Sequence, residues 1–298
     1  MTNQTVNVVF FGISNLGIKI LKNILKNKKF NIIFAITREK AKPHVVDIEK
    51  KYFNLIKQNN LNLKKNLINI KKLPQNTIGI IGGYDGIVKK KDIEKFDLGI
   101  YNIHFGIIPY VRGCNPIMWS ILNNHFGYSI YKIDKKIDKG RNVYSKLYKI
   151  RSNLYLNSKN IYDLLSKSSF IKFKNTILKN PNNISFKKNL KLQSNYFNKH
   201  LPNNSYISWN WKPELIKKFS NAFYFPPYKS CRTKYKSKDI YLEVVDFKKK
   251  KSFKKDFGRI IKRNRRMIYI IVNGGLIKAK LHEEYSIICK GIKLKSIE

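Results

Sequence analysis

The feature that most constrains the fold is an alternation of apolar runs with segments of helical periodicity in the first part of the chain. Val6–Phe11 is an apolar run, which is typical of a strand buried on both faces of a parallel sheet. Gly12 ends the run, and Ser14 is placed to cap a helix. Apolar residues then recur at helical spacing, at Leu16, Ile20, Leu21, Ile24 and Leu25.

The same alternation continues for about 180 residues. Further strands are predicted at Asn31–Ile36, Ile78–Ile81, Gly99–Phe105 and Tyr128–Ile133. Helices are predicted at Val46–Ile56, at Pro116–Asn123 and at about 159–178. This pattern predicts an α/β fold: a Rossmann-like, open, mostly parallel sheet with helices on both faces and right-handed crossovers.

The chain changes character after a polar, Asn- and Lys-rich stretch at 180–200. Short strands separated by glycines are predicted beyond it, at Ile240–Asp246, Gly258–Lys262, Met267–Val272 and Leu276–Leu281. We therefore expect a catalytic domain over 1–190 and a smaller β-rich domain over 200–298.

Several classes of protein are disfavoured by what the sequence lacks. The first strand is followed by neither G-x-G-x-x-G nor a Walker sequence, so NAD and ATP are not expected as cofactors. Cys114, Cys231 and Cys289 lie far apart, which argues against a disulfide scaffold or a cysteine zinc site. No apolar run reaches transmembrane length. We expect a cytoplasmic protein that makes no membrane contact.

The formal net charge of +43 is a weaker guide than its size suggests. Of 61 basic residues only nine are arginine, and Asn, Ile, Tyr and Phe are also abundant. These residues share A/T-rich codons, so a drift in base composition explains the lysines without selection for a polyanion. We therefore interpret the net charge as a lysine-rich surface. Such a charge also raises the rate at which the protein encounters anionic substrates.

A polar constellation lies at the end of the strand Gly99–Phe105. Asn102 and His104 share one side of that strand because side chains alternate. Asp138 follows the next predicted strand, 34 residues beyond His104, a spacing that suits a strand–helix–strand unit. Such a unit brings two adjacent strand ends together, so we expect Asn102, His104 and Asp138 to share one crevice.

This set of side chains limits the chemistry. No Ser or Cys stands in a nucleophile-elbow context, and one His with one Asp is too few for a normal zinc site. We therefore expect no metal and favour direct attack by a substrate amine on an activated acyl carbon. Asn102 can donate to the developing oxyanion. His104, supported by Asp138, can stabilise the same oxygen or relay a proton.

At these residues the chain resembles the formyltransferases that use 10-formyltetrahydrofolate. The shared motifs are N-x-H-x-x-x-L-P, R-G-x-x-P and I-D-x-x-I-D-x-G. They correspond here to Asn102–Pro109, Arg112–Pro116 and Ile133–Gly140. Lys139, Gly106 and Lys89 depart from the residues usual at their positions, but none of the three removes a catalytic group.

The resemblance implies roles for particular residues. Asn102, His104 and Asp138 are the implied catalytic trio. The implied binding residues for the folate co-substrate are Tyr84, Asp85, Gly86, Ile87 and Asp134. Those implied for the acceptor are Arg112, Gly113, Trp209 and Tyr228.

The sequence constrains the identity of the acceptor amine less than it constrains the catalytic residues. Relatives that formylate initiator methionyl-tRNA usually carry a basic insertion after the second strand, whereas Thr37–His44 runs on without one. The segments Arg112–Trp119 and Ala222–Tyr228 look more like enzymes that N-formylate nucleotide-linked amino sugars. We therefore expect a small-molecule nucleotide-sugar acceptor, with initiator tRNA as the alternative. A homodimer is left open.

Two further hypotheses remain at this point. The high charge and the three departures would also suit a non-catalytic RNA-binding protein on a transferase scaffold. A purine-pathway formyltransferase shares the Asn–His–Asp trio, but the R-G-C-N-P run and the added β-rich domain argue against it.

Overall fold

The structure is a computed structural model that describes residues 5–37, 46–149 and 156–297. The chain divides into two compact units. The first comprises Met1–Pro116, Gly127–Tyr148 and Asp163–Tyr196, and the second comprises Ile117–Phe126, Lys149–Tyr162 and Phe197–Glu298. Most of the Thr37–His44 run, used above to weigh the acceptor, lies outside the described residues. The domain limits 1–190 and 200–298 stay a prediction.

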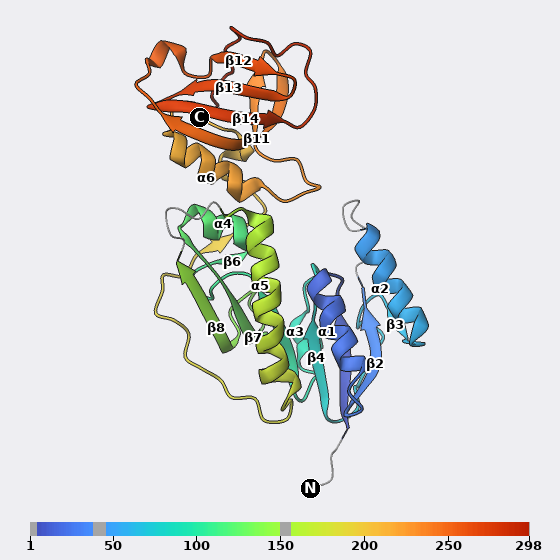
Figure 1. The fold of residues 1–298 in the computed structure, drawn as a ribbon. Helices are drawn as coiled ribbons and strands as arrows, with labels where there is room; N and C mark the ends of the chain where they lie inside the picture. The colour runs from blue at the N-terminus through green and yellow to red at the C-terminus, as the bar shows by residue number, and fades with distance from the viewer. Residues whose placement is uncertain (1–4, 38–45, 150–155, 298) are drawn as a thin grey trace. The chain divides into compact units, whose positions relative to one another are not determined.

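A seven-stranded sheet organises the first part of the chain, in the order β3-β2-β1-β4-β5-β7-β8 (Figure 1). Its strands are β1 (Val6–Phe11), β2 (Phe30–Ile36), β3 (Leu63–Lys64), β4 (Thr77–Ile81), β5 (Gly99–His104), β7 (His125–Lys132) and β8 (Arg141–Lys149). The strands β1 to β5 run parallel to one another. The predicted open, mostly parallel sheet is confirmed.

Helices connect these strands, as the periodicity predicted. They are α1 (Asn15–Leu25), α2 (Val46–Gln58), α3 (Lys90–Ile93), α4 (Pro116–Leu122) and α5 (Ser158–Phe173), the last continuing as a π-helical turn, Lys174–Leu178. The Ser14 hydroxyl accepts a hydrogen bond from the Gly17 N–H, so the predicted cap of α1 is confirmed. Two short strands, β6 (Arg112–Gly113) and β9 (Tyr196–Phe197), pair separately.

The strand order reverses at β1, because β2 lies on one side of it and β4 on the other. Open α/β sheets bind ligands outside the carboxyl ends of the strands at such a point. Gly12 follows β1 there with φ +91°, and a Cβ on Gly12 would lie only 2.3 Å from the Tyr84 nitrogen. A glycine is therefore required for the segment after β4 to approach the end of β1 this closely.

One expectation about the sheet is wrong. We predicted that β5 and the following strand form a strand–helix–strand unit with adjacent carboxyl ends. Instead β7 runs antiparallel to β5, with His104 opposite Ser129 and Asn102 opposite Tyr131. The carboxyl ends of these two strands therefore lie at opposite ends of the pair, and another feature must bring Asp138 to His104.

The second unit contains a five-stranded antiparallel sheet in the order β10-β11-β14-β13-β12 (Figure 1). Its strands are β10 (Arg232–Tyr235), β11 (Lys238–Lys249), β12 (Ile260–Asn264), β13 (Met267–Val272) and β14 (Gly275–Leu281). Short 3₁₀ turns occur at Pro202–Ser205 and Lys254–Asp256.

A helix that the sequence reading did not predict, α6 (Pro213–Phe223), packs on β11 of this sheet. The Ser220 hydroxyl accepts a hydrogen bond from the Val244 N–H, and one face of α6 buries Ile216, Phe219 and Phe223. The prediction of a β-rich C-terminal region is correct for the sheet. It is incomplete because it omits α6, which packs on that sheet.

Candidate active site

Asn102 and Tyr131 form the first link of a polar cluster in the first unit. They are cross-strand partners on β5 and β7, so their side chains leave the same face of the sheet. The Asn102 Nδ2 donates a hydrogen bond to the Tyr131 hydroxyl at 3.0 Å. The antiparallel register of the two strands creates this contact.

Asp138 joins the cluster from the loop between β7 and β8. Its Oδ1 accepts a hydrogen bond from the Tyr131 hydroxyl at 2.6 Å, and its Oδ2 accepts one from the Gly113 N–H at 2.8 Å. The residue is buried and has a positive φ of 48°. The loop thus turns back after β7, which explains how Asp138 reaches β5 although the strand directions differ from the prediction.

His104 completes the cluster. Its Nδ1 lies 3.8 Å from Asp138 Oδ2, which is an ion-pair distance but too long for a hydrogen bond. Its Nε2 lies 2.8 Å from the Val111 carbonyl oxygen. A carbonyl oxygen can only accept a hydrogen bond, so Nε2 carries a hydrogen. If the ring is neutral, Nδ1 has no hydrogen, and its lone pair is on the side of Asp138. The structure therefore brings Asn102, His104 and Asp138 together; with Tyr131 we call them the polar cluster.

Tyr131 is the member that the sequence analysis missed. Burial and the negative charge of Asp138 hold the pKa of its hydroxyl well above the usual 10, and the hydrogen bond to Asp138 acts in the same direction. The hydroxyl is therefore protonated throughout the neutral range. No sequence signal identified Tyr131, because its place opposite Asn102 depends on a strand direction that the periodicity does not encode.

Four of the five residues implied for the folate co-substrate follow β4, next to the point where the strand order reverses, and the fifth, Asp134, follows β7. Tyr84 packs against Phe11 with ring centroids 5.7 Å apart, and Asp85, Gly86 and Ile87 are exposed. Tyr84 and Ile87 help to line a pocket of about 140 Å³. Asp134 is exposed and does not line this pocket; its Oδ1 accepts a hydrogen bond from the Lys135 N–H.

Arg112 and Gly113, which were predicted to contact the acceptor, lie beside the polar cluster. Gly113 holds Asp138 through its backbone N–H, and its φ of +90° is one that a side chain strains. The Arg112 guanidinium lies 5.6 Å from the centre of the Tyr196 ring and donates to the Ile137 carbonyl at 3.4 Å. Gly113 therefore has a structural task in addition to any contact with substrate.

Trp209 and Tyr228, also predicted to contact the acceptor, lie in different environments. Trp209 is fully buried, and its indole N–H donates to the Thr233 hydroxyl at 3.2 Å. It therefore packs the interior of the second unit and leaves no exposed indole face for a ligand. Tyr228 is 46% exposed and borders a pocket in the same unit.

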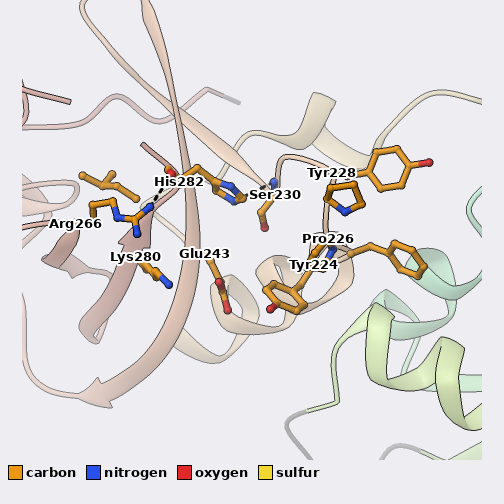
Figure 2. A pocket seen from close by; sticks show the side chains of 11 residues that line it. Tyr224, Pro226, Tyr228, Ser230, Glu243, Arg266, Lys280 and His282 are labelled. Atoms are coloured by element: carbon orange, nitrogen blue, oxygen red, sulfur yellow. Dashed lines mark hydrogen bonds between the residues drawn. The ribbon is translucent and has the colours of Figure 1, made fainter. Parts of the chain in front are cut away.

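This pocket, which we call the C-terminal pocket, has a volume of about 260 Å³. Figure 2 shows the aromatic side chains of Tyr224 and Tyr228 on one side, Arg266 and Lys280 on the other, and Glu243 between them. Arg266 donates to the carbonyl oxygen of His282, whose ring accepts from the Ser230 N–H. Burial raises the pKa of Glu243, although Lys217 and Lys280 oppose this shift.

The described residues hold neither a cluster typical of a metal site nor a helix that could span a membrane. No cluster of three or more His, Cys, Asp or Glu side chains in that part of the chain has the arrangement of a metal site. None of its helices is both long and apolar enough to cross a membrane.

The chain thus has a mostly parallel α/β sheet with an amide, an imidazole and a carboxylate gathered beside β5 and β7, followed by a small antiparallel sheet. The sequence model of the formyl transferase family matches residues 6–163, more than half of the chain. The chain therefore belongs to the formyl transferase family.

Sequence relatives point to two kinds of protein. The bifunctional polymyxin resistance protein ArnA of Wigglesworthia glossinidia brevipalpis is 30% identical over 240 residues, covering 74% of this chain and 35% of ArnA. The methionyl-tRNA formyltransferase of Pseudothermotoga lettingae is 26% identical over 151 residues, covering 49% of this chain and 48% of that protein. The matches thus cover half or less of the length of these relatives.

Solved structures share the fold along nearly the whole chain. WlaRD, a sugar 3N-formyltransferase crystallised in the presence of dTDP and 5-N-formyl-THF, gives a TM-score of 0.70 at 20% identity, covering 95% of this chain and 100% of WlaRD. The N-formyltransferase from Helicobacter canadensis, in complex with folinic acid and dTDP-3-aminofucose, gives 0.68 at 19% identity, covering 93% and 100%. At these sequence identities the comparison shows that the proteins share a fold.

Proposed function

We propose that this protein is an N-formyltransferase that moves a formyl group from 10-formyltetrahydrofolate to the amine of a nucleotide-linked amino sugar. The observation that carries the proposal is the polar cluster. In a chain of the formyl transferase family, hydrogen bonds through Tyr131 connect Asn102 to Asp138, and His104 lies at ion-pair distance from Asp138. The proposal treats the reaction as a direct transfer within a ternary complex, without a covalent bond to the protein.

Asn102 is the first donor that we assign to the formyl oxygen. This oxygen gains negative charge as the amine nitrogen attacks the formyl carbon. Asn102 is partly exposed, and its amide has two N–H groups, of which one donates to Tyr131. The second is available for the developing oxyanion. Such a donor contributes roughly 3 kcal/mol in comparable sites.

His104 supplies the second donor. Its Nε2–H is now directed at the Val111 carbonyl, which holds the ring in place. An oxyanion is a stronger acceptor than a neutral carbonyl, because charge-assisted hydrogen bonds are about twice as strong. The N–H can therefore exchange Val111 for the formyl oxygen as charge develops. When Nδ1 is also protonated, the Asp138 carboxylate 3.8 Å away stabilises the charged ring.

Residues of the first unit also suit the folate. When bound, 10-formyltetrahydrofolate supplies the formyl group, and its N10 takes up the proton that the amine loses. We assign the pterin to the turn at Tyr84–Ile87, where a pocket lined by apolar and charged side chains adjoins the carboxyl ends of β1 and β4. Asp134 is assigned to the same ligand only by family resemblance.

The C-terminal pocket supports a nucleotide-linked acceptor over other amines. Its aromatic side chains can stack on a base, and Arg266 and Lys280 can bind phosphate. Tyr228 stays in the proposed set of acceptor residues, with Arg112 and Gly113 in the first unit. The buried Trp209 leaves this set.

Initiator methionyl-tRNA is the second candidate acceptor. The second unit also has a hollow lined by Lys262, Arg263, Arg265 and Lys290, and several relatives are methionyl-tRNA formyltransferases. Binding through such lysines and arginines would weaken steeply with added salt, because phosphate contacts release counterions.

An acceptor screen with 10-formyltetrahydrofolate separates these functions. Purified protein is mixed with dTDP- and UDP-linked amino sugars or with initiator methionyl-tRNA, and release of tetrahydrofolate is followed, with His104→Ala as the inactive control. We expect turnover with a nucleotide sugar. Turnover with the tRNA alone would identify initiator methionyl-tRNA, and not a nucleotide sugar, as the acceptor. Tight, salt-sensitive RNA binding without transfer to any amine would instead support a non-catalytic RNA-binding protein.

A further inference from the structure

We propose that Tyr131 is a positioning residue: its hydroxyl fixes which end of the Asn102 amide faces the reacting oxygen and holds the Asp138 carboxylate beside His104. The inference rests on the proposed transferase function and adds a fourth residue to its site. Its basis is the hydrogen-bonded chain from Asn102 Nδ2 through Tyr131 Oη to Asp138 Oδ1, with steps of 3.0 and 2.6 Å.

The direction of this chain follows from counting protons. A phenol has one hydroxyl hydrogen, and a carboxylate can only accept. The hydrogen of Tyr131 is therefore committed to Asp138, and the phenol oxygen is left as an acceptor toward Asn102. Because burial and the charge of Asp138 raise the pKa of Tyr131 well above 10, this arrangement persists through the neutral range.

The amide of Asn102 is consequently oriented. A side-chain amide can present either its NH₂ or its oxygen in nearly the same space, and the surrounding groups decide between them. Tyr131 accepts only from the NH₂, so one N–H of Asn102 is bound and the second is directed elsewhere. The opposite orientation would place two acceptor oxygens together and offer the formyl oxygen no donor.

The same hydroxyl restrains Asp138 from the side opposite Gly113. One carboxylate oxygen accepts from Tyr131 and the other from the Gly113 N–H, so rotation of the carboxylate breaks both bonds. His104 Nδ1 lies 3.8 Å from the oxygen that Gly113 holds. Tyr131 thus connects Asn102 to Asp138 and acts through these two residues without a contact to substrate.

The decisive test is Tyr131→Phe, with Tyr128→Phe as the matched control. Tyr128 is a buried tyrosine on the same strand, but its hydroxyl is near Ser168. We expect Tyr131→Phe to lower kcat about 10- to 100-fold, a range typical of lost orientation. The KM values for folate and acceptor should stay within about two-fold, and Tyr128→Phe should keep wild-type kcat. A wild-type kcat in Tyr131→Phe, or a loss confined to KM, overturns the role.

A second replacement guards against a variant that does not fold. 4-Aminophenylalanine at position 131 keeps the size of tyrosine and the donor to Asp138, but it is a poor acceptor for Asn102. It should lower kcat without changing KM, and an unchanged kcat refutes the orientation of Asn102 by Tyr131.

A readout without catalysis separates this inference from the proposed function. In protein labelled with ¹⁵N-asparagine, the side-chain NH₂ signal of Asn102 should shift in Tyr131→Phe and remain in place in Tyr128→Phe. An unmoved signal rejects the positioning role even in an active enzyme. If Tyr131→Phe shifts the signal but the wild-type protein transfers no formyl group, the proposed function is rejected. The hydrogen-bonded chain from Asn102 to Asp138 is then retained.

Discussion

The polar cluster of the first unit and the C-terminal pocket of the second unit hold their charged groups in opposite ways. In the cluster, Asp138 has a hydrogen bond to each oxygen. In the pocket, Glu243 and Lys280 are cross-strand partners on β11 and β14, yet among the described residues neither side chain makes a hydrogen bond or an ion pair. The cluster is organised before any ligand arrives, whereas the pocket keeps charges available.

This difference predicts two kinds of kinetic effect. Changes in a preorganised cluster remove interactions that act in the transition state and should lower kcat. Changes in a pocket with available charges remove ground-state binding and should raise KM.

Asp138→Ala should have the largest effect, a loss of turnover of about 10²–10⁴-fold, the range attributed to acid–base groups. The carboxylate supports His104, and its removal also leaves the Tyr131 hydroxyl and the Gly113 N–H without an acceptor. Single-turnover kinetics and circular dichroism measure activity and folding. Lys136→Ala, an exposed change in the same loop, is the control. Wild-type turnover in Asp138→Ala would contradict the proposed site.

Gly113→Ala should lower kcat about 10-fold. At a φ of +90° a side chain adds a strain of roughly 1–2 kcal/mol, so we expect the backbone to move and weaken the N–H bond to Asp138. Steady-state kinetics and the melting temperature together measure the effect. An unchanged kcat with a lowered melting temperature would show that Gly113 serves stability alone.

Arg266→Ala in the C-terminal pocket should raise the KM for the nucleotide sugar about five-fold, or about 1 kcal/mol, and leave kcat and the folate KM unchanged. Its guanidinium lines the pocket and is held by the His282 carbonyl. Arg259→Ala, which removes an arginine paired with Asp256, is the control in the same unit. If kcat fell and KM did not, the contrast between the two regions would fail.

His282 should give the smallest effect, a decline in stability below neutral pH. Burial lowers the pKa of this imidazole below 6.5, and the nearby charges of Lys229, Lys280 and Arg266 act in the same direction, against Glu283. The unfolded chain therefore takes up a proton that the folded state resists, and stability falls as pH drops below about 6.5. Urea midpoints at several pH values should show a shallower decline in His282→Gln. An equal decline in both proteins would assign the pH dependence to other groups.

Local patterns were enough to predict much of the first unit. The apolar run of β1, the Ser14 cap and the spacing in α1 are short-range features, and each appears in the structure where the sequence placed it. The motifs at Asn102, His104 and Asp138 likewise selected residues that lie together. The reason given for their meeting was nevertheless wrong, because β7 is antiparallel to β5.

Other features depend on contacts between distant residues. The helix α6 was overlooked in a stretch rich in aromatic residues. Trp209 was assigned to substrate, although packing in the second unit buries it completely. The C-terminal pocket draws its walls from the segment 224–230, from β11, from β14 with His282 that follows it, and from Arg266 that precedes β13. No local pattern reports such an arrangement, since its parts meet only after the sheet has formed.

The sequence by itself determined the alternating α/β framework, the small β-rich region and three of the four polar residues, because periodicity and motif spacing are properties of neighbouring positions. Only the tertiary structure decided that Tyr131 joins Asn102 to Asp138 and that Gly113 supplies a backbone donor. Strand direction sets which side chains face each other across a sheet, and burial beside a carboxylate raises the pKa of a hydroxyl. Both arise from long-range packing.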